Sequence, residues 1–183
     1  MIILASKSPR RKQLLEQAEI PFEIITLDTD ENFPDNLSIE EVPVFIAQQK
    51  AKAVAALHSG ETILAADTIV TIGNAIIGKP KDRTDAIHIL QQLSGKTHRV
   101  ITGVAIISEN GEESFYDITE VEFHLLRNEQ IEFYVDKYQP YDKAGAYAIQ
   151  EWIGVVGIKK INGDFYNVMG LPVSRVVRVL QKL

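Results

Sequence analysis

The sequence contains no cysteine, and this absence removes several kinds of chemistry at once. Disulfides, thiolate nucleophiles and cysteine-ligated zinc all need a sulfur atom that the chain does not supply. The histidines offer little in its place, because they do not stand at the spacing of a metal site; they are His58, His88, His98 and His124. The ligands left for a metal are oxygen atoms, which suit Mg²⁺ or Mn²⁺, and single histidines.

Long apolar runs and a surplus of positive charge are missing too. No stretch approaches the roughly 20 residues that span a bilayer, and the apolar N-terminal stretch is too short for a signal peptide. We therefore expect a cytoplasmic protein with no membrane partner. The 19 lysines and arginines are outnumbered by 25 acidic residues, which gives a net charge of −6. Such a chain lacks the broad basic face that nucleic acid needs, so a local basic cluster suits a small anion better.

Neither GxxxxGKS/T nor GxGxxG occurs in the chain, so a P-loop and a Rossmann dinucleotide site are both unsupported. Strand-like and helix-like segments alternate along the 183 residues, which are 45% hydrophobic and contain no repeat or linker. This favours a single α/β domain over residues 1–183. The pattern predicts strands over 2–4, 22–27, 62–72, 75–77, 99–108, 111–123 and 153–161, and helices over 9–18, 38–57, 84–93, 128–134 and 172–183. Gly73-Asn74 is expected to form a tight turn that joins the strands 62–72 and 75–77 in a hairpin.

A basic segment opens the first predicted helix. Between Ser6 and Lys12 the chain places two hydroxyls and four cations, and Ser8 stands at the expected N-cap of a helix that begins at Pro9. Free N–H groups and the helix dipole favour phosphate at such an end, and arginine adds a planar fork for two oxygens. The segment indicates a polyanion site, with a merely capped and solvated helix start as the alternative.

Four further features invite a functional interpretation. Asp67 lies inside an apolar strand pattern, where a carboxylate is costly unless it is paired, hydrogen-bonded or bound to metal; capping a turn or pairing with one lysine is the structural alternative. Lys79 is held between a glycine and a proline, and alone it would be a surface lysine. The acidic run 28–31 offers oxygen ligands for a divalent metal or is a solvated loop. Residues 163–172 predict a shaped loop that encloses a ligand or simply joins two elements.

Taken together, eight motifs resemble those of the Maf family of nucleoside triphosphate pyrophosphatases, in order and over essentially the whole chain. They are Ala5-Ser6-Lys7-Ser8-Pro9-Arg10-Arg11, Asp30-Glu31, Lys50-Ala51-Lys52-Ala53, Ala66-Asp67-Thr68, Gly78-Lys79-Pro80, and residues 94–98, 142–150 and 163–172. The resemblance implies an α/β fold with an elongated mixed β-sheet, flanking helices and two lobes around a cleft, similar to inosine triphosphate pyrophosphatases. It also implies cleavage of a nucleoside triphosphate between its α and β phosphates with a divalent metal.

The resemblance extends to the dTTP/UTP pyrophosphatase branch of this family. Three positions separate that branch from the one that hydrolyses 7-methyl-GTP, and they are Arg10, Thr68 and Gln150 here. The other branch typically has an aromatic residue, a glutamine and a glutamate instead. The resemblance therefore implies hydrolysis of dTTP and UTP, or of a modified pyrimidine nucleotide, to the monophosphate and pyrophosphate, in a house-cleaning or division-arrest role.

The residue types suit the roles that the resemblance gives them. Asp67 is expected to orient or deprotonate the attacking water and, with Glu31, to ligate Mg²⁺ or Mn²⁺. Gln150 presents a donor and an acceptor that match the edge of uracil or thymine, with Thr68 beside Asp67 to complete that contact. The triphosphate is expected to meet a hydroxyl and several cations, namely Ser6, Arg10, Arg11, Lys79 and either Lys50 or Lys52.

Three questions stay open at the level of sequence. The family is associated with septum formation and arrest of cell division, so the alternative function is a nucleotide-dependent regulatory binder with only secondary hydrolysis. A homodimer is common in the family, but no apolar stripe in this sequence requires one. Lys50 and Lys52 are two residues apart on a predicted helix and face different directions, so the sequence does not say which one faces the site.

Overall fold

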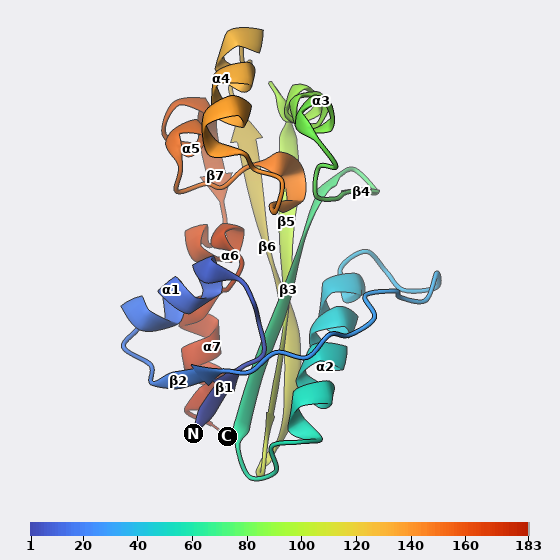
Figure 1. The fold of residues 1–183 in the computed structure, drawn as a ribbon, viewed down its shortest axis with the longest axis vertical. Coiled ribbons are helices and arrows are strands. Elements are labelled where there is room, and N and C mark those ends of the chain that lie inside the picture. The colour runs from blue at the N-terminus through green and yellow to red at the C-terminus, as the bar shows by residue number, and fades with distance from the viewer. Residues whose placement is uncertain (183) are drawn as a thin grey trace. The chain divides into compact units, whose positions relative to one another are not determined.

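A computed structural model describes residues 1–182 of the chain (Figure 1). Its strands are β1 (Ile2–Leu4), β2 (Phe22–Ile24), β3 (Thr62–Ile72), β4 (Ala75–Ile77), β5 (Thr97–Ser108), β6 (Gly111–Phe123) and β7 (Ile158–Asn162). Its helices are α1 (Pro9–Gln17), α2 (Glu41–Ala55), α3 (Arg83–Leu93), α4 (Asn128–Tyr138), α5 (Trp152–Gly157), α6 (Phe165–Met169) and α7 (Val173–Leu180), with a 3₁₀ helix η1 (Ala144–Ala146). None of the helices in this range has the length and apolar content of a membrane-spanning segment.

The strands form one seven-stranded mixed sheet in the order β2-β1-β3-β5-β6-β7, with β4 paired to β3. β1 lies parallel to both β2 and β3, with Ile2 opposite Phe22 on one side and Thr62 on the other. Parallel neighbours need crossover connections, which is why α1 follows β1 and α2 precedes β3. β3 and β4 form the predicted antiparallel hairpin, and β6 pairs antiparallel with β7. The α/β class predicted from the sequence is confirmed.

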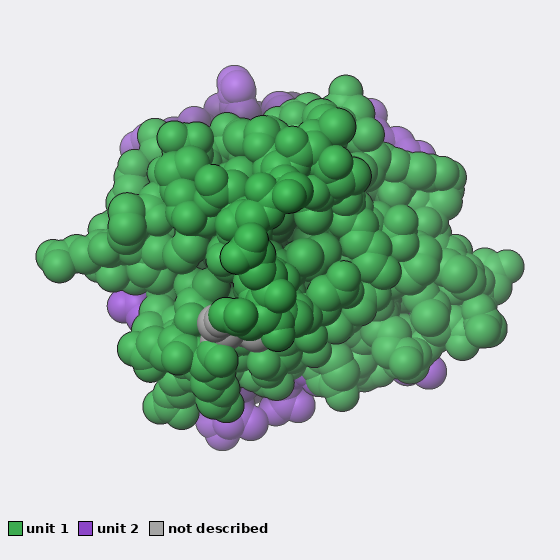
Figure 2. Space-filling view, turned by 90° about the horizontal axis from the view of Figure 1, so that it is seen from below, with its two compact units in different colours: residues 1–68, 102–117, 170–183 green, residues 69–101, 118–169 purple. Residues whose placement is uncertain are grey.

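The chain divides into two compact units, which are green and purple in Figure 2. Unit 1 comprises residues 1–68, 102–117 and the described part of 170–183, whereas unit 2 comprises residues 69–101 and 118–169. The unit boundaries fall within β3, β5 and near the middle of β6, so each of these strands contributes residues to both units.

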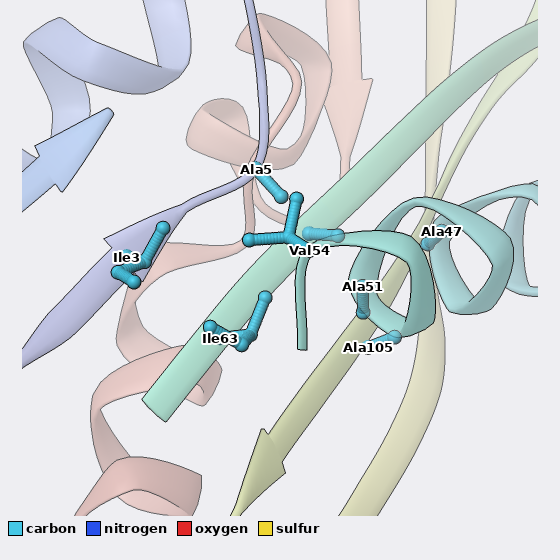
Figure 3. Packing of buried hydrophobic residues seen from close by; sticks show 8 residues of the cluster. Ile3, Ala5, Ala47, Ala51, Val54, Ile63 and Ala105 are labelled. Carbon is cyan, nitrogen blue, oxygen red and sulfur yellow. The ribbon is translucent and has the colours of Figure 1, made fainter. Parts of the chain in front are cut away.

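The core of unit 1 beneath α2 is built largely from small side chains (Figure 3). Strand side chains alternate between faces, so every second residue of β1 and β3 meets the helix. The helix packs so closely that a Cβ on Gly103 would lie 2.2 Å from the carbonyl carbon of Pro43. The cluster consists of Ile3, Ala5, Ala47, Ala51, Val54, Ile63, Ala65 and Ala105.

One predicted strand is wrong in its first half. The sequence pattern predicts a strand over 153–161, but the chain forms α5 first and only then β7. Val155 and Val156 favour a strand by propensity. However, Ile153 is buried and the Trp152 ring packs edge-on against Phe133, with 4.8 Å between ring centroids. The packing of these two side chains outweighs the local preference of the valines.

Residues 163–172 are also more regular than predicted, because α6 occupies their centre. Asp164 Oδ1 accepts a hydrogen bond from the Tyr166 backbone N–H at 2.8 Å, and Gly170 follows the helix with a φ of +113°. An aspartate before a helix and a glycine after it are capping signals that the sequence does carry. The remaining differences are shifts of one to four residues at the ends of elements.

His98 and Tyr147 form a buried polar pair in unit 2. His98 Nε2 lies 2.7 Å from the Tyr147 hydroxyl, and both rings pack against Phe123. Burial lowers the pKa of His98 from its ordinary 6.5 to about 4. Burial also raises the pKa of Tyr147 above its ordinary value.

Acid should therefore destabilise the fold through His98. The unfolded histidine binds a proton more readily than the folded one, so its stabilising effect is complete above pH 6.5 and is lost as the pH falls toward 4. We expect about 3 kcal/mol of the unfolding free energy to be lost through His98 over this window. Urea unfolding of the wild type and His98→Gln between pH 4 and 7 measures the difference. If the free energy of unfolding changed with pH in the same way in both proteins, His98 would not be the group responsible.

Candidate active site

Asp67 is placed by the strand pattern that made it unusual in the sequence. It follows Ile63 and Ala65 on the face of β3 that α2 covers. Lys50 shares the sheet-facing side of α2 with neighbours three or four residues away, namely Ala47 and Val54. Its Nζ lies 2.8 Å from Asp67 Oδ1, and the two side chains are 19% and 17% exposed. Lys52 is exposed, so Lys50 is the lysine that meets Asp67.

Glu31 joins this pair from the loop between β2 and α2. Its Oε1 lies 2.8 Å from the same Lys50 Nζ, so one ammonium group bridges two carboxylates. The described residues contain no group of three histidine or carboxylate side chains that could hold a metal ion. Mg²⁺, however, usually takes only one or two protein carboxylates and completes its shell with water and substrate phosphate. Asp67 and Glu31 fit that donor set.

Arg11, in the first turn of α1, is buried. Its guanidinium donates from Nε to the Gly170 carbonyl oxygen at 2.7 Å, from Nη1 to Ser6 Oγ at 3.1 Å and from Nη2 to Thr68 Oγ1 at 2.9 Å. Burial lowers the pKa of Arg11 to about 10. Three of its five N–H donors are used in these bonds, which tie α1 to β3 and to the residue that follows α6. Its contact with a triphosphate stays a prediction.

The hydroxyls of unit 1 extend this hydrogen-bond network. Ser6 Oγ accepts from the Ser8 backbone N–H at 3.2 Å, and Ser8 Oγ accepts from the Arg11 backbone N–H at 3.5 Å as the predicted N-cap. Thr68 Oγ1 lies 2.9 Å from Thr102 Oγ1 on β5. Because strand residues alternate, Thr68 points to the face of β3 opposite Asp67. The Thr68 hydroxyl is held by two protein groups, the Arg11 guanidinium and the Thr102 hydroxyl.

Three of the predicted site residues lie close enough to Arg11 for their charges to shift its pKa. Asp67 and Glu31 raise the pKa of Arg11 and the half-buried Arg10 lowers it, although burial has the larger effect. The structure thus brings together seven predicted site residues within unit 1, namely Ser6, Arg10, Arg11, Glu31, Lys50, Asp67 and Thr68.

Of the other predicted residues, the exposed Lys52 belongs to unit 1, whereas Lys79 and Gln150 belong to unit 2 and are both exposed. Lys79 stands in the turn after β4, and Gln150 follows a run of buried residues after η1. The Gly145 backbone N–H donates to the Gly78 carbonyl oxygen at 3.2 Å. This bond brings the turn of Lys79 next to the segment that carries Gln150.

Two residues of the network were missed in the sequence. Gly170 accepts the Arg11 bond in a backbone conformation that favours glycine, and a Cβ there would lie 3.5 Å from Thr68 Oγ1. Its place in the unusual segment 163–172 was the available signal. Thr102 gave no signal, since a threonine in a strand is ordinary.

Comparison with known proteins finds similarity over the whole chain. A family model described as Maf-like protein matches residues 1–183. A dTTP/UTP pyrophosphatase from Cytophaga hutchinsonii is 52% identical over 182 residues, covering 100% of this chain and 84% of that protein. Proteins with the same description from Bacteroides thetaiotaomicron and Bacillus mycoides are 47% and 49% identical, covering 100% and 99% of this chain and 95% and 94% of theirs.

Among solved structures, a HAM1 protein from Coxiella burnetii is similar, with a TM-score of 0.53 and 17% identity over 100% of this chain and 98% of that one. At this identity the likeness concerns the fold, and it agrees with the inosine triphosphate pyrophosphatase-like α/β fold expected from the motifs. The family model and the relatives also match this chain in sequence, over its whole length. The chain therefore belongs to the Maf family.

Proposed function

We propose that the protein hydrolyses dTTP and UTP between the α and β phosphates, releasing the nucleoside monophosphate and pyrophosphate. The observation that carries the proposal is the partly buried Asp67, held by Lys50 at 2.8 Å on β3. Full-length relatives at about 50% identity are described as dTTP/UTP pyrophosphatases, which supports the choice of substrate.

Asp67 is the proposed proton acceptor. Lys50 bonds to Oδ1, and no described residue forms a hydrogen bond with Oδ2, so this oxygen can accept a proton from water. The water oxygen attacks the α-phosphorus, the bond from that phosphorus to the bridging oxygen breaks, and pyrophosphate leaves with the bonding electrons. The ammonium of Lys50 stands beside the reacting group and offsets the negative charge that develops there.

Glu31 and Asp67 are the residues that would hold Mg²⁺ or Mn²⁺. When bound, such an ion supplies positive charge to the phosphoryl oxygens. Ser6, Arg10, Arg11 and Lys79 keep the triphosphate contacts predicted for them. Gln150 and Thr68 keep the predicted contact with the pyrimidine base.

A panel of nucleoside triphosphates tests the proposal. We expect pyrophosphate release from dTTP and UTP with kcat/KM roughly tenfold or more above CTP, ATP, GTP and 7-methyl-GTP, because a site built to hydrogen-bond one base edge rejects others. EDTA should abolish the activity, and Mg²⁺ or Mn²⁺ should restore it. Preference for 7-methyl-GTP, or release of phosphate instead of pyrophosphate, would overturn the assignment.

The regulatory-binder alternative is separated from this proposal by counting turnovers. An enzyme forms many moles of product per mole of protein, whereas a binder with secondary hydrolysis stops near one. The descriptions of the relatives favour the enzyme. The cytoplasmic location and the homodimer stay predictions, and sedimentation of the purified chain tests the second.

A further inference from the structure

The segment that carries Gln150 is anchored in unit 2 by a buried tyrosine that none of the sequence motifs includes. Tyr134, on α4, is fully buried. Its hydroxyl accepts a hydrogen bond from the Ala148 backbone N–H at 3.1 Å and donates one to the Glu151 carboxylate. One hydroxyl group therefore holds the chain two residues before Gln150 and one residue after it.

Four further contacts fix the same segment. Lys143 is buried, and its Nζ lies 3.8 Å from Glu151 Oε1 and 2.8 Å from Asp142 Oδ1. Backbone bonds close the turns at either end, from Ala146 to Lys143 and from Glu151 to Ala148. Residues 145–149 are buried, whereas Gln150 is exposed. The segment is thus a rigid support from which Gln150 projects.

The purely structural alternative is that Tyr134 only fills space in the core. Phenylalanine would fill the same apolar volume, and burying a hydroxyl is unfavourable unless the hydroxyl is bonded. The bonds of this hydroxyl go specifically to the two residues that flank Ile149 and Gln150. Glutamine has several rotatable bonds, so reading one base edge with it depends on a fixed backbone.

We propose that Tyr134, through Ala148 and Glu151, is a positioning residue that holds Gln150 for recognition of the pyrimidine base. The inference rests on the proposed function, because Gln150 has the base contact only there. It adds a specificity role for a buried hydroxyl on α4. If Tyr134 has this role, loss of its hydroxyl should weaken substrate recognition because Gln150 is displaced, and not because the fold as a whole is less stable.

A double-mutant cycle tests this requirement. Tyr134→Phe and Gln150→Ala should each raise the KM for dTTP about tenfold, with kcat changed less than about threefold, since each removes the effect of roughly one hydrogen bond. The double variant should resemble Gln150→Ala alone, because the positioned group is already gone. Both single variants should also lower the preference for dTTP over CTP.

Tyr138→Phe is the matched control. Tyr138 lies on the same helix and stacks on Tyr134, with ring centroids 5.0 Å apart, but its hydroxyl has no hydrogen bond to a described residue. It should leave the KM unchanged. If Tyr134→Phe fails to fold in a thermal-unfolding check, Glu151→Ala takes its place in the cycle.

The outcomes separate this inference from the proposed function. The role of Tyr134 would be overturned if the two substitutions raised the KM of the double variant multiplicatively, or if Tyr134→Phe left the KM unchanged. The proposed hydrolysis of dTTP would not be affected by either result. An unchanged KM in Gln150→Ala would remove the base contact and this inference with it. If the wild type released no pyrophosphate, the proposed function would fail, and the dissociation constants of α,β-methylene-dTTP would complete the same cycle.

Discussion

Asp67→Asn should lower kcat for dTTP by roughly 10²- to 10⁴-fold, the range that a positioned general base contributes. Asparagine keeps the size of the side chain and one oxygen to accept the Lys50 hydrogen bond, which joins Nζ to Asp67 Oδ1 at 2.8 Å. It cannot take a proton from water. Binding of α,β-methylene-dTTP should therefore change much less than kcat, and stopped-assay pyrophosphate measurements together with calorimetric titration check both quantities.

Asp35→Asn is the matched control for this substitution. Asp35 is an exposed carboxylate in the loop before α2, and it is not one of the predicted site residues. Its kcat should equal that of the wild type. Turnover near the wild-type rate in Asp67→Asn would remove Asp67 from the mechanism, and a loss of nucleotide binding equal to the loss of kcat would make it a binding residue.

Arg11→Lys should lower the free energy of unfolding by about 2–4 kcal/mol, although it keeps the charge. The guanidinium bonds to Gly170, Ser6 and Thr68 at once, and all three acceptors lie around a buried side chain. An ammonium group on a shorter stem cannot reach the three directions of this planar fork. Acceptors left unpaired in the interior keep their full desolvation cost.

Chemical denaturation measures this effect, with Arg178→Lys as the control. Arg178 lies exposed on α7, where the same substitution should change stability by less than about 0.5 kcal/mol. Equal stability of Arg11→Lys and the wild type would show that the buried fork contributes little. Arg11 would then be better described as a ligand-binding cation, as the sequence first suggested.

Local patterns predicted much of the fold correctly. Ser8 does cap α1, and the Gly73-Asn74 turn does join β3 to β4, because both depend on residues close together in the chain. The helix α5 was not predicted because the contact that stabilises it involves a residue far away in the sequence. Trp152 packs on Phe133, some twenty residues earlier in the chain, and no local rule for Val155 contains that contact.

The candidate site divides in the same way. The motifs indicated which side chains carry charge, but the partner of Asp67 required the register of α2 against β3, which sets Lys50 inward and leaves Lys52 exposed. The burial of Arg11 was not predictable from the basic segment, since a short segment with four cations among six residues usually marks a solvated surface. Its acceptor Gly170 lies 159 residues away, so only the folded chain brings them together.

Hydrolysis of dTTP in H₂¹⁸O tests the central claim most directly. If water attacks the α-phosphorus, mass spectrometry should find one ¹⁸O atom in dTMP and none in the pyrophosphate. Label in the pyrophosphate, or formation of dTDP and labelled phosphate, would contradict the proposed cleavage between the α and β phosphates.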